Sequence, residues 1–145
     1  MSVYADTSAL YAVIDADDAN HCAARSTWVE LLEGDTPLVC SNYVLLETCA
    51  LIQHRLGVDA VRGFRKSVYP VLQVEWVDKR MHETAVTAVV TANRRGLSVV
   101  DCVSFEVMRV LGIDTAFSFD AHFEEQDFIC LPHVSLHDRS AHLGE

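Results

Sequence analysis

Five short apolar segments, separated by stretches of helical pattern, constrain the fold of this chain more than any other feature of its sequence. The apolar segments have the length of buried strands and cover residues 2–5, 38–40, 71–77, 114–117 and 128–131. The segments between them predict helices over residues 9–14, 21–33, 43–55, 58–66, 79–95, 98–111 and 121–127. This alternation predicts an α/β fold: a three-layer sandwich with a central parallel β-sheet and helices on both faces.

The 145 residues are most simply one domain. No repeat or linker divides residues 1–131, and the polar, histidine-bearing residues 132–145 are predicted to be a flexible C-terminal tail. No apolar run is long enough to span a bilayer, and Met1 leads directly into the first strand, so neither a membrane segment nor a signal peptide is expected. The five cysteines include no CxxC pair and lie among apolar residues, which favours reduced core thiols in a cytoplasmic protein.

The charge of the chain limits how it could bind nucleic acid. The formal net charge is −10, whereas a protein that grips nucleic acid mainly through phosphates is normally basic. Either nucleic acid is not the substrate, or many acids serve chemistry and binding is local, metal-assisted or aided by a partner. Hydrophobic residues make up 50% of the chain, which indicates that some apolar surface is buried against a partner.

Four carboxylates stand alone in segments whose neighbours should be buried. They are Asp6 in VYADTSAL, Glu47 in YVLLETCALI, Asp101 in SVVDCVSF and Asp120 in FSFDAHF. Burying an unpaired carboxylate costs several kcal/mol or forces it to take up a proton. Asp6 and Asp120 follow strands and so lie at the carboxyl edge of the sheet, while the helices carrying Glu47 and Asp101 can approach that edge.

Four carboxylates in one pocket repel each other unless cations are present. Carboxylate and water oxygens are the ligands that Mg²⁺ and Mn²⁺ prefer, so the pattern predicts a site for one or two such ions. Ions there could activate a water and stabilise charge on a phosphodiester. Ser8 and Ser118 are the small polar companions, suited to orient Asp6, a metal-bound water or the other metal-binding carboxylates.

Each of these residues also has a structural explanation. Asp101 forms a capping-box pattern with Ser98, and Asp6 and Asp120 could each cap a helix. Ser8 or Thr7 could cap the first helix, and Ser118 could be an ordinary turn serine. Glu47 could form a salt bridge with Arg55 or Arg94. The joint pattern of four carboxylates favours a site over four separate structural roles.

The order and spacing of these motifs resemble the PIN-domain family, with the closest match among VapC-like ribonuclease toxins of type II toxin–antitoxin pairs. The resemblance runs from Ser2 to about Leu131 and rests on DTSAL, the glutamate inside an apolar helix, SxxDC and FSFDAHF. It implies a Mg²⁺- or Mn²⁺-dependent endoribonuclease, often a homodimer, that a cognate antitoxin holds inactive. Asp6, Glu47, Asp101 and Asp120 match the family's acidic quartet, and Ser8 and Ser118 match its hydroxyl positions.

Other basic residues and a histidine have less specific signals. Arg62, Arg65 and Lys66 share one helix face that could contact RNA phosphates, although a solvated face is the favoured interpretation. His122 is close enough to Asp120 to touch substrate, but a surface histidine is favoured. Arg94 and Arg95 at the end of the helix over 79–95 are expected to complement its dipole.

Two other functional classes compete with the nuclease interpretation. A phosphotransfer protein could use Asp6 as a nucleophile, but a HAD-like phosphatase has a second aspartate where this chain has Ser8. A receiver domain needs an acid pair after the first strand and a lysine near the last, and neither is evident. A catalytically degenerate interaction module is the other alternative, and the intact quartet argues against it.

Overall fold

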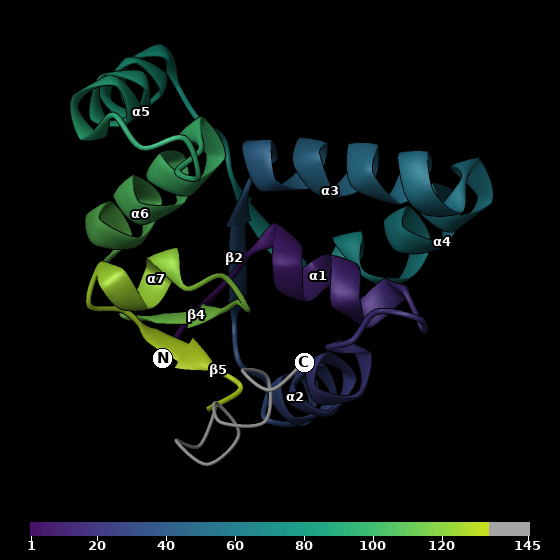
Figure 1. Ribbon diagram of the computed structural model, residues 1–145. Coiled ribbons are helices and arrows are strands. Elements are labelled where there is room, and N and C mark those ends of the chain that lie inside the picture. The colour runs from purple at the N-terminus through teal and green to yellow at the C-terminus, as the bar shows by residue number, and fades with distance from the viewer. Residues whose placement is uncertain (134–145) are drawn as a thin grey trace, which may run out of the picture.

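A five-stranded parallel sheet lies at the centre of the computed structural model, which describes residues 1–133 (Figure 1). The strands are β1 (Val3–Ala5), β2 (Leu38–Ser41), β3 (Leu72–Glu75), β4 (Thr115–Phe117) and β5 (Ile129–Leu131). Their order is β3-β2-β1-β4-β5, and every neighbouring pair is parallel. The predicted central parallel sheet is therefore confirmed.

Helices cover both faces of the sheet. They are α1 (Thr7–Ile14), α2 (His21–Glu33), α3 (Asn42–Leu56), α4 (Val58–Ser67), α5 (Lys79–Ala92), α6 (Val99–Leu111) and α7 (His122–Glu125), and a 3-10 turn (Tyr69–Val71) precedes β3. Figure 1 shows α1, α2 and α4 on one side of the sheet and α5, α6 and α7 on the other. The three-layer arrangement expected from the alternation of strands and helices is confirmed.

The fifth helix is shorter than predicted. It ends at Ala92 because Asn93 adopts a left-handed conformation, with φ 50° and ψ 43°. Asparagine tolerates this conformation and commonly ends helices with it. The predicted helix bound of Arg95 is therefore wrong, and Arg94 and Arg95 lie just beyond the C-terminal end of α5.

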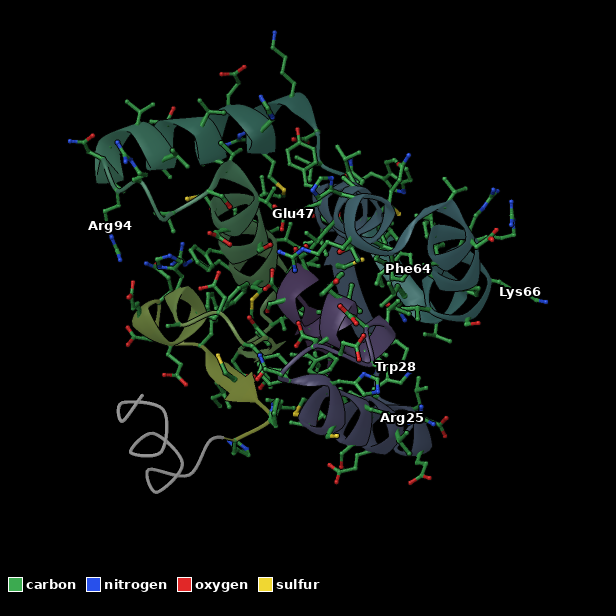
Figure 2. All side chains as sticks on the ribbon, turned by 45° about the vertical axis from the view of Figure 1, so that its right-hand side comes forward. Arg25, Trp28, Glu47, Phe64, Lys66 and Arg94 are labelled. Atoms are coloured by element: carbon green, nitrogen blue, oxygen red, sulfur yellow. The ribbon has the colours of Figure 1, made fainter. Side chains whose placement is uncertain are left out.

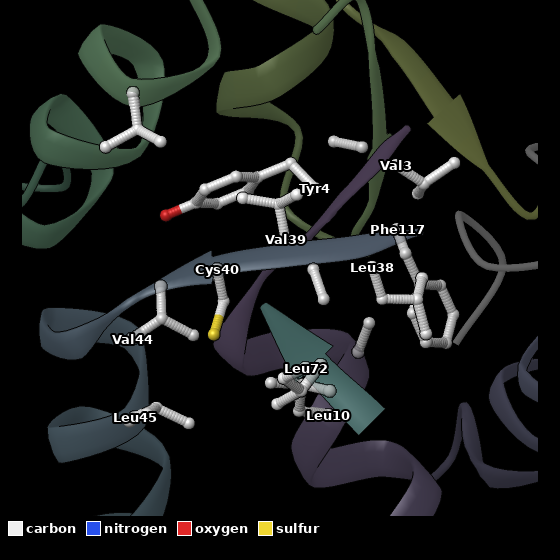
Figure 3. Close-up of a cluster of buried hydrophobic side chains, with 14 of the residues drawn as sticks. Val3, Tyr4, Leu10, Leu38, Val39, Cys40, Val44, Leu45, Leu72 and Phe117 are labelled. Carbon is white, nitrogen blue, oxygen red and sulfur yellow. The ribbon is translucent and has the colours of Figure 1, made fainter. Parts of the chain in front are cut away.

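The core continues through both faces of the sheet. Figure 3 shows the side chains of Val39 and Cys40 leaving β2 on opposite sides, and both residues are buried. Burial on both faces explains why these strands are continuous apolar runs rather than alternating ones. All five cysteines are free, as predicted, but Cys22 is exposed on α2 and so is not a core thiol.

The structure describes only part of the predicted C-terminal tail. The tail predicted over 132–145 lies outside them from residue 134 onward. Within residues 1–133, no helix combines the length and the apolar character that crossing a membrane requires.

A buried hydroxyl pair links β1 to α6 and provides a test of the core. The Tyr4 hydroxyl donates to Ser104 Oγ at 2.8 Å, and both residues are fully buried. The Tyr4→Phe variant should lose about 1 kcal/mol of unfolding free energy, because Ser104 loses its partner. Urea denaturation measures the loss, and the double variant Tyr4→Phe/Ser104→Ala should recover most of it. A single variant as stable as the wild type would contradict the assignment.

Candidate functional site

The candidate site lies where the chain changes direction across the sheet. From β1 the chain proceeds to β2 on one side, while β4 occupies the other side of β1. Ligands of open parallel sheets bind outside the carboxyl ends of the strands at such a switch point. Asp6 directly follows β1, and Ser118 to Asp120 directly follow β4, so both segments reach this position. The Asp6 N–H donates to the carbonyl of Phe117 at 3.0 Å and fixes the two segments together.

Asp6 is buried and serves two roles at once. The residue is only 3% exposed. Its side chain caps α1 by accepting a hydrogen bond from the Ser8 N–H at 3.3 Å. It also accepts from Ser8 Oγ at 2.8 Å and from Ser118 Oγ at 3.1 Å. Burial raises the pKa of Asp6 to about 6; the Ser8 hydrogen bonds oppose this rise, and the charges of Asp101 and Asp120 add to it. The capping interpretation of Asp6 is thus confirmed without excluding a site role.

The two serines join α1 to the segment after β4. Ser8 Oγ lies 3.3 Å from Ser118 Oγ and accepts from the Phe119 N–H at 3.0 Å. Ser118 Oγ in turn accepts from the Asp120 N–H at 3.0 Å. Asp6 is the N-cap of α1, so the alternative in which Ser8 or Thr7 caps this helix is wrong.

Asp101 lies in the first turn of α6, and Asp120 follows β4. Asp101 forms the predicted capping box with Ser98: its Oδ2 accepts from the Ser98 N–H, and its own N–H donates to Ser98 Oγ, both at 3.0 Å. Burial raises its pKa, and the charge of Asp120 raises it further. Asp120 Oδ1 accepts from the His122 N–H at 2.9 Å, although the N-cap position of α7 is Ala121. Single ligand atoms of Asp101, Asp120 and His122 lie within 4.8 Å of one another.

Glu47 completes the set from α3. Burial raises its pKa, a hydrogen bond from Thr7 lowers it, and the charges of Asp101 and Asp120 raise it. The salt bridge considered from the sequence is absent among the described residues: Arg94 pairs with Glu125, and the Arg55 guanidinium lies over the Tyr11 ring. Figure 2 shows Glu47 on the side of α3 that faces α6.

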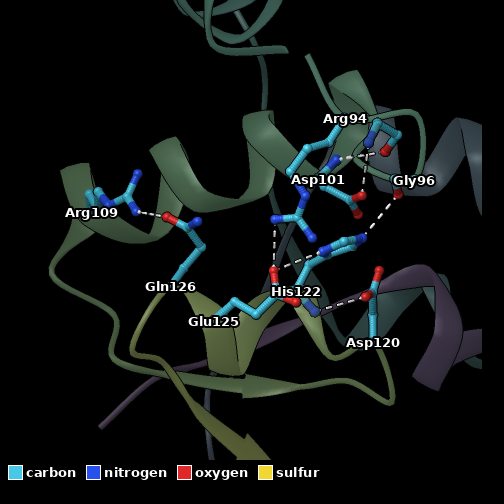
Figure 4. Close-up of polar contacts among 9 residues, drawn as sticks. Arg94, Gly96, Asp101, Arg109, Asp120, His122, Glu125 and Gln126 are labelled. Atoms are coloured by element: carbon cyan, nitrogen blue, oxygen red, sulfur yellow. Dashed lines mark hydrogen bonds and ion pairs between the residues drawn. The ribbon is translucent and has the colours of Figure 1, made fainter. Parts of the chain in front are cut away.

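The network around His122 was not predicted from the sequence. Its Nε2 lies 2.9 Å from the carbonyl oxygen of Gly96, and its Nδ1 lies 3.3 Å from Glu125 Oε2, which also accepts from Arg94 at 2.9 Å (Figure 4). The position of His122 two residues after Asp120 was the only sequence signal for it. Arg94 and Glu125 are 31 residues apart, and nothing in their sequence context connects them.

The donor set fits a hard divalent cation. Asp101 and Asp120 offer carboxylate oxygens within 4.8 Å of each other, and Asp6 and Glu47 lie near enough for the charges of those two residues to raise their pKa values. Ser8 and Ser118 add hydroxyls beside Asp6. Within residues 1–133, no lysine or arginine forms an ion pair with Asp6, Glu47, Asp101 or Asp120. Carboxylate oxygens that no lysine or arginine neutralises are ligands that Mg²⁺ and Mn²⁺ prefer.

The predicted basic face lies apart from the carboxylates. Arg62, Arg65 and Lys66 are on α4, and Figure 2 shows Lys66 pointing outward, far from Glu47. Arg62 forms an ion pair with Asp59, one turn earlier on the same helix. Contact of this face with RNA remains a prediction.

Comparison with known proteins gives a consistent result. A family model described as PIN domain matches residues 3–129. The chain is 36% identical over 129 residues to the 23S rRNA-specific endonuclease VapC20 of Mycobacterium tuberculosis, in strains CDC 1551 / Oshkosh and H37Rv; the match covers 88% of this chain and 95% of that protein. The crystal structure of the same species' VapC20, described as a sarcin-ricin loop cleaving toxin, superposes with a TM-score of 0.76. This structural match has 34% identity and covers 88% of this chain and 97% of that one.

Proposed function

Because the chain belongs to the PIN-domain family, we propose that it is a metal-dependent endoribonuclease and the toxin of a toxin–antitoxin pair. The observation that supports the proposal is the cluster of Asp101 and Asp120 beside Asp6 and Glu47 at the switch point of the sheet, with no lysine or arginine paired to these four residues among residues 1–133. The PIN-domain match spans residues 3–129 and so includes every element that carries the four carboxylates, and the relatives named as RNA-cleaving proteins cover 88% of this chain.

Each carboxylate has a proposed role. Asp6, Asp101 and Asp120 hold the cation, and Glu47 binds it or positions the attacking water. Ser8 and Ser118 keep the Asp6 carboxylate oriented through hydrogen bonds of 2.8 and 3.1 Å. A bound Mg²⁺ or Mn²⁺ would supply Lewis acidity, lowering the pKa of a water molecule and offsetting charge on the phosphodiester. No side chain needs to act as a nucleophile.

The acidic composition shapes how RNA would bind. With a net charge of −10, long-range attraction to RNA is unfavourable, so binding depends on local contacts at the cation and on basic side chains elsewhere on the surface. The proposed phosphate contacts lie on α4, where the sequence spacing places Arg62, Arg65 and Lys66 on one face. VapC20 acts on 23S rRNA, so structured ribosomal RNA is the first substrate class to test.

Protein partners follow from the family and from the surface. We propose a cognate antitoxin and a homodimer, in the cytoplasm, where thiols stay reduced. Large apolar side chains support a protein partner, because Leu46, Trp76 and Val90 are each about 70% exposed.

Removal of the metal tests the proposed function directly. Total RNA and purified ribosomes should be cleaved in Mg²⁺ or Mn²⁺, and excess EDTA should abolish cleavage because the carboxylates alone cannot activate water. Adding back either ion should restore the product bands. Cleavage that survives EDTA would contradict the metal mechanism, and the Asp6→Asn protein purified in parallel controls for a contaminating nuclease.

A further inference from the structure

We propose that Arg94, Glu125 and His122 form a positioning clamp that holds Asp101 and Asp120 at the separation that a metal ion requires, with His122 outside the metal's ligand set. The inference deepens the proposed function and rests on its metal site. The clamp is defined by these three residues and the Gly96 carbonyl, and Figure 4 shows how they join two parts of the chain.

Two contacts of the clamp join the same two segments of the chain. Arg94 and Gly96 lie in the connection between α5 and α6, while His122 and Glu125 lie on α7. Arg94 Nη1 donates to Glu125 Oε2 at 2.9 Å, and His122 Nε2 contacts the Gly96 carbonyl oxygen at 2.9 Å. His122 Nδ1 lies 3.3 Å from the same Glu125 oxygen and so links these two contacts.

Each end of the clamp continues directly to a carboxylate. On α7, the His122 N–H donates to Asp120 Oδ1 at 2.9 Å. On the other segment, Gly96 is two residues before Ser98, whose N–H donates to Asp101 Oδ2 at 3.0 Å. Asp101 and Asp120 belong to different elements, so contacts between these elements must set their separation.

The contacts of the His122 ring argue against metal ligation. A ligating imidazole presents a lone pair on an unprotonated nitrogen. The Gly96 carbonyl oxygen can only accept, so Nε2 carries hydrogen, and Nδ1 faces a carboxylate that also accepts when ionised. For either nitrogen to bind a metal, the ring would have to leave Gly96 or Glu125 and so open the clamp.

Exposure predicts that the clamp affects the site more than overall stability. The Arg94 and Glu125 side chains are about half exposed, and an exposed ion pair contributes little to folding. The His122 side chain is only 18% exposed, and it carries the link to both carboxylates. Loss of a residue that orients metal ligands typically weakens metal affinity by about 10–100-fold.

The test compares Arg94→Ala with Arg95→Ala. Arg95 is the adjacent arginine, is exposed and forms no ion pair among residues 1–133, so its variant removes the same charge without opening the clamp. In the metal-free protein, Arg94→Ala should speed hydrogen exchange at the Ser98 and His122 amides about tenfold. Its Mn²⁺ affinity, measured by paramagnetic resonance of the free ion, should fall about tenfold with little change in melting temperature. Arg94→Lys should restore most of the protection from exchange and most of the Mn²⁺ affinity, because it keeps a cation beside Glu125.

Two results would overturn the clamp. One is Arg94→Ala matching Arg95→Ala in exchange and in Mn²⁺ affinity. The other is His122→Ala abolishing Mn²⁺ binding while Arg94→Ala leaves it unchanged, which would make His122 a ligand. A wild-type protein that cleaves no RNA would contradict the proposed function instead, and the metal-free exchange data would still decide the clamp.

Discussion

Replacing Asp6 with asparagine is expected to reduce metal-dependent RNA cleavage by at least about a hundredfold and to stabilise the metal-free protein at neutral pH. Cleavage falls because a neutral amide oxygen is a weaker ligand for a divalent cation than a carboxylate. Stability rises because the folded protein no longer holds a desolvated negative charge beside those of Asp101 and Asp120. The rise in the Asp6 pKa from 3.8 to about 6 corresponds to an upper limit of about 3 kcal/mol.

Asp78→Asn is the matched control for this substitution. Asp78 is also the N-cap of a helix, since its carboxylate accepts from the Met81 N–H at 2.8 Å, but it is exposed and caps α5. Asparagine is as good an N-cap as aspartate, so both variants keep their caps. Activity assays and urea denaturation should separate them: only Asp6→Asn loses cleavage and gains stability. An Asp6→Asn protein that stays active and loses stability would mark Asp6 as a cap alone.

The metal-free protein should become more stable as the pH falls from 8 to 5. The folded pKa of Asp6, about 6, lies above its unfolded value of 3.8, so between these values the folded state binds more protons. Protonation therefore favours folding, with a gain that begins as the pH falls through 6 and is complete below 4. The raised pKa values of Glu47 and Asp101 act in the same direction.

Urea midpoints at a series of pH values in EDTA measure this effect. The Asp6→Asn variant should show a flatter profile, since it lacks the carboxyl group whose pKa burial raises to about 6. Saturating Mg²⁺ should reverse the slope of the wild type, because the ion binds the ionised carboxylates and is released as they protonate. A wild-type midpoint that is constant or falls with decreasing pH in EDTA would contradict the burial of an ionisable cluster.

The sheet, and the position of Asp6 and Asp120 at one edge of it, could be predicted because both follow from local patterns. Asp6 and Asp120 are next to strand ends, and the carboxyl ends of parallel strands share one edge. The end of α5 was not predictable in the same way, because it depends on Asn93 adopting a left-handed conformation that its neighbours do not encode.

Contacts made only by the tertiary fold escaped prediction. Arg94 was matched to the dipole of its own helix or to Glu47, whereas the fold pairs it with Glu125 on α7. The packing of α7 beside the α5–α6 connection decides which long side chains meet. The residue pattern of neither segment predicts that packing. His122 was interpreted as a surface histidine for the same reason, because its contacts with Gly96 and Glu125 form only in the tertiary fold.

Two helices begin at the carboxylate cluster, and this has a consequence for the order in which the protein is assembled. Asp6 caps α1 and Asp101 lies in the first turn of α6, so each charge faces the positive end of a helix dipole and accepts backbone N–H groups. The fold thereby contributes its own partial compensation for the acids it gathers. The chain can therefore complete its core before any cation binds, so under the proposed metal mechanism the ion would be needed for cleavage and not for folding.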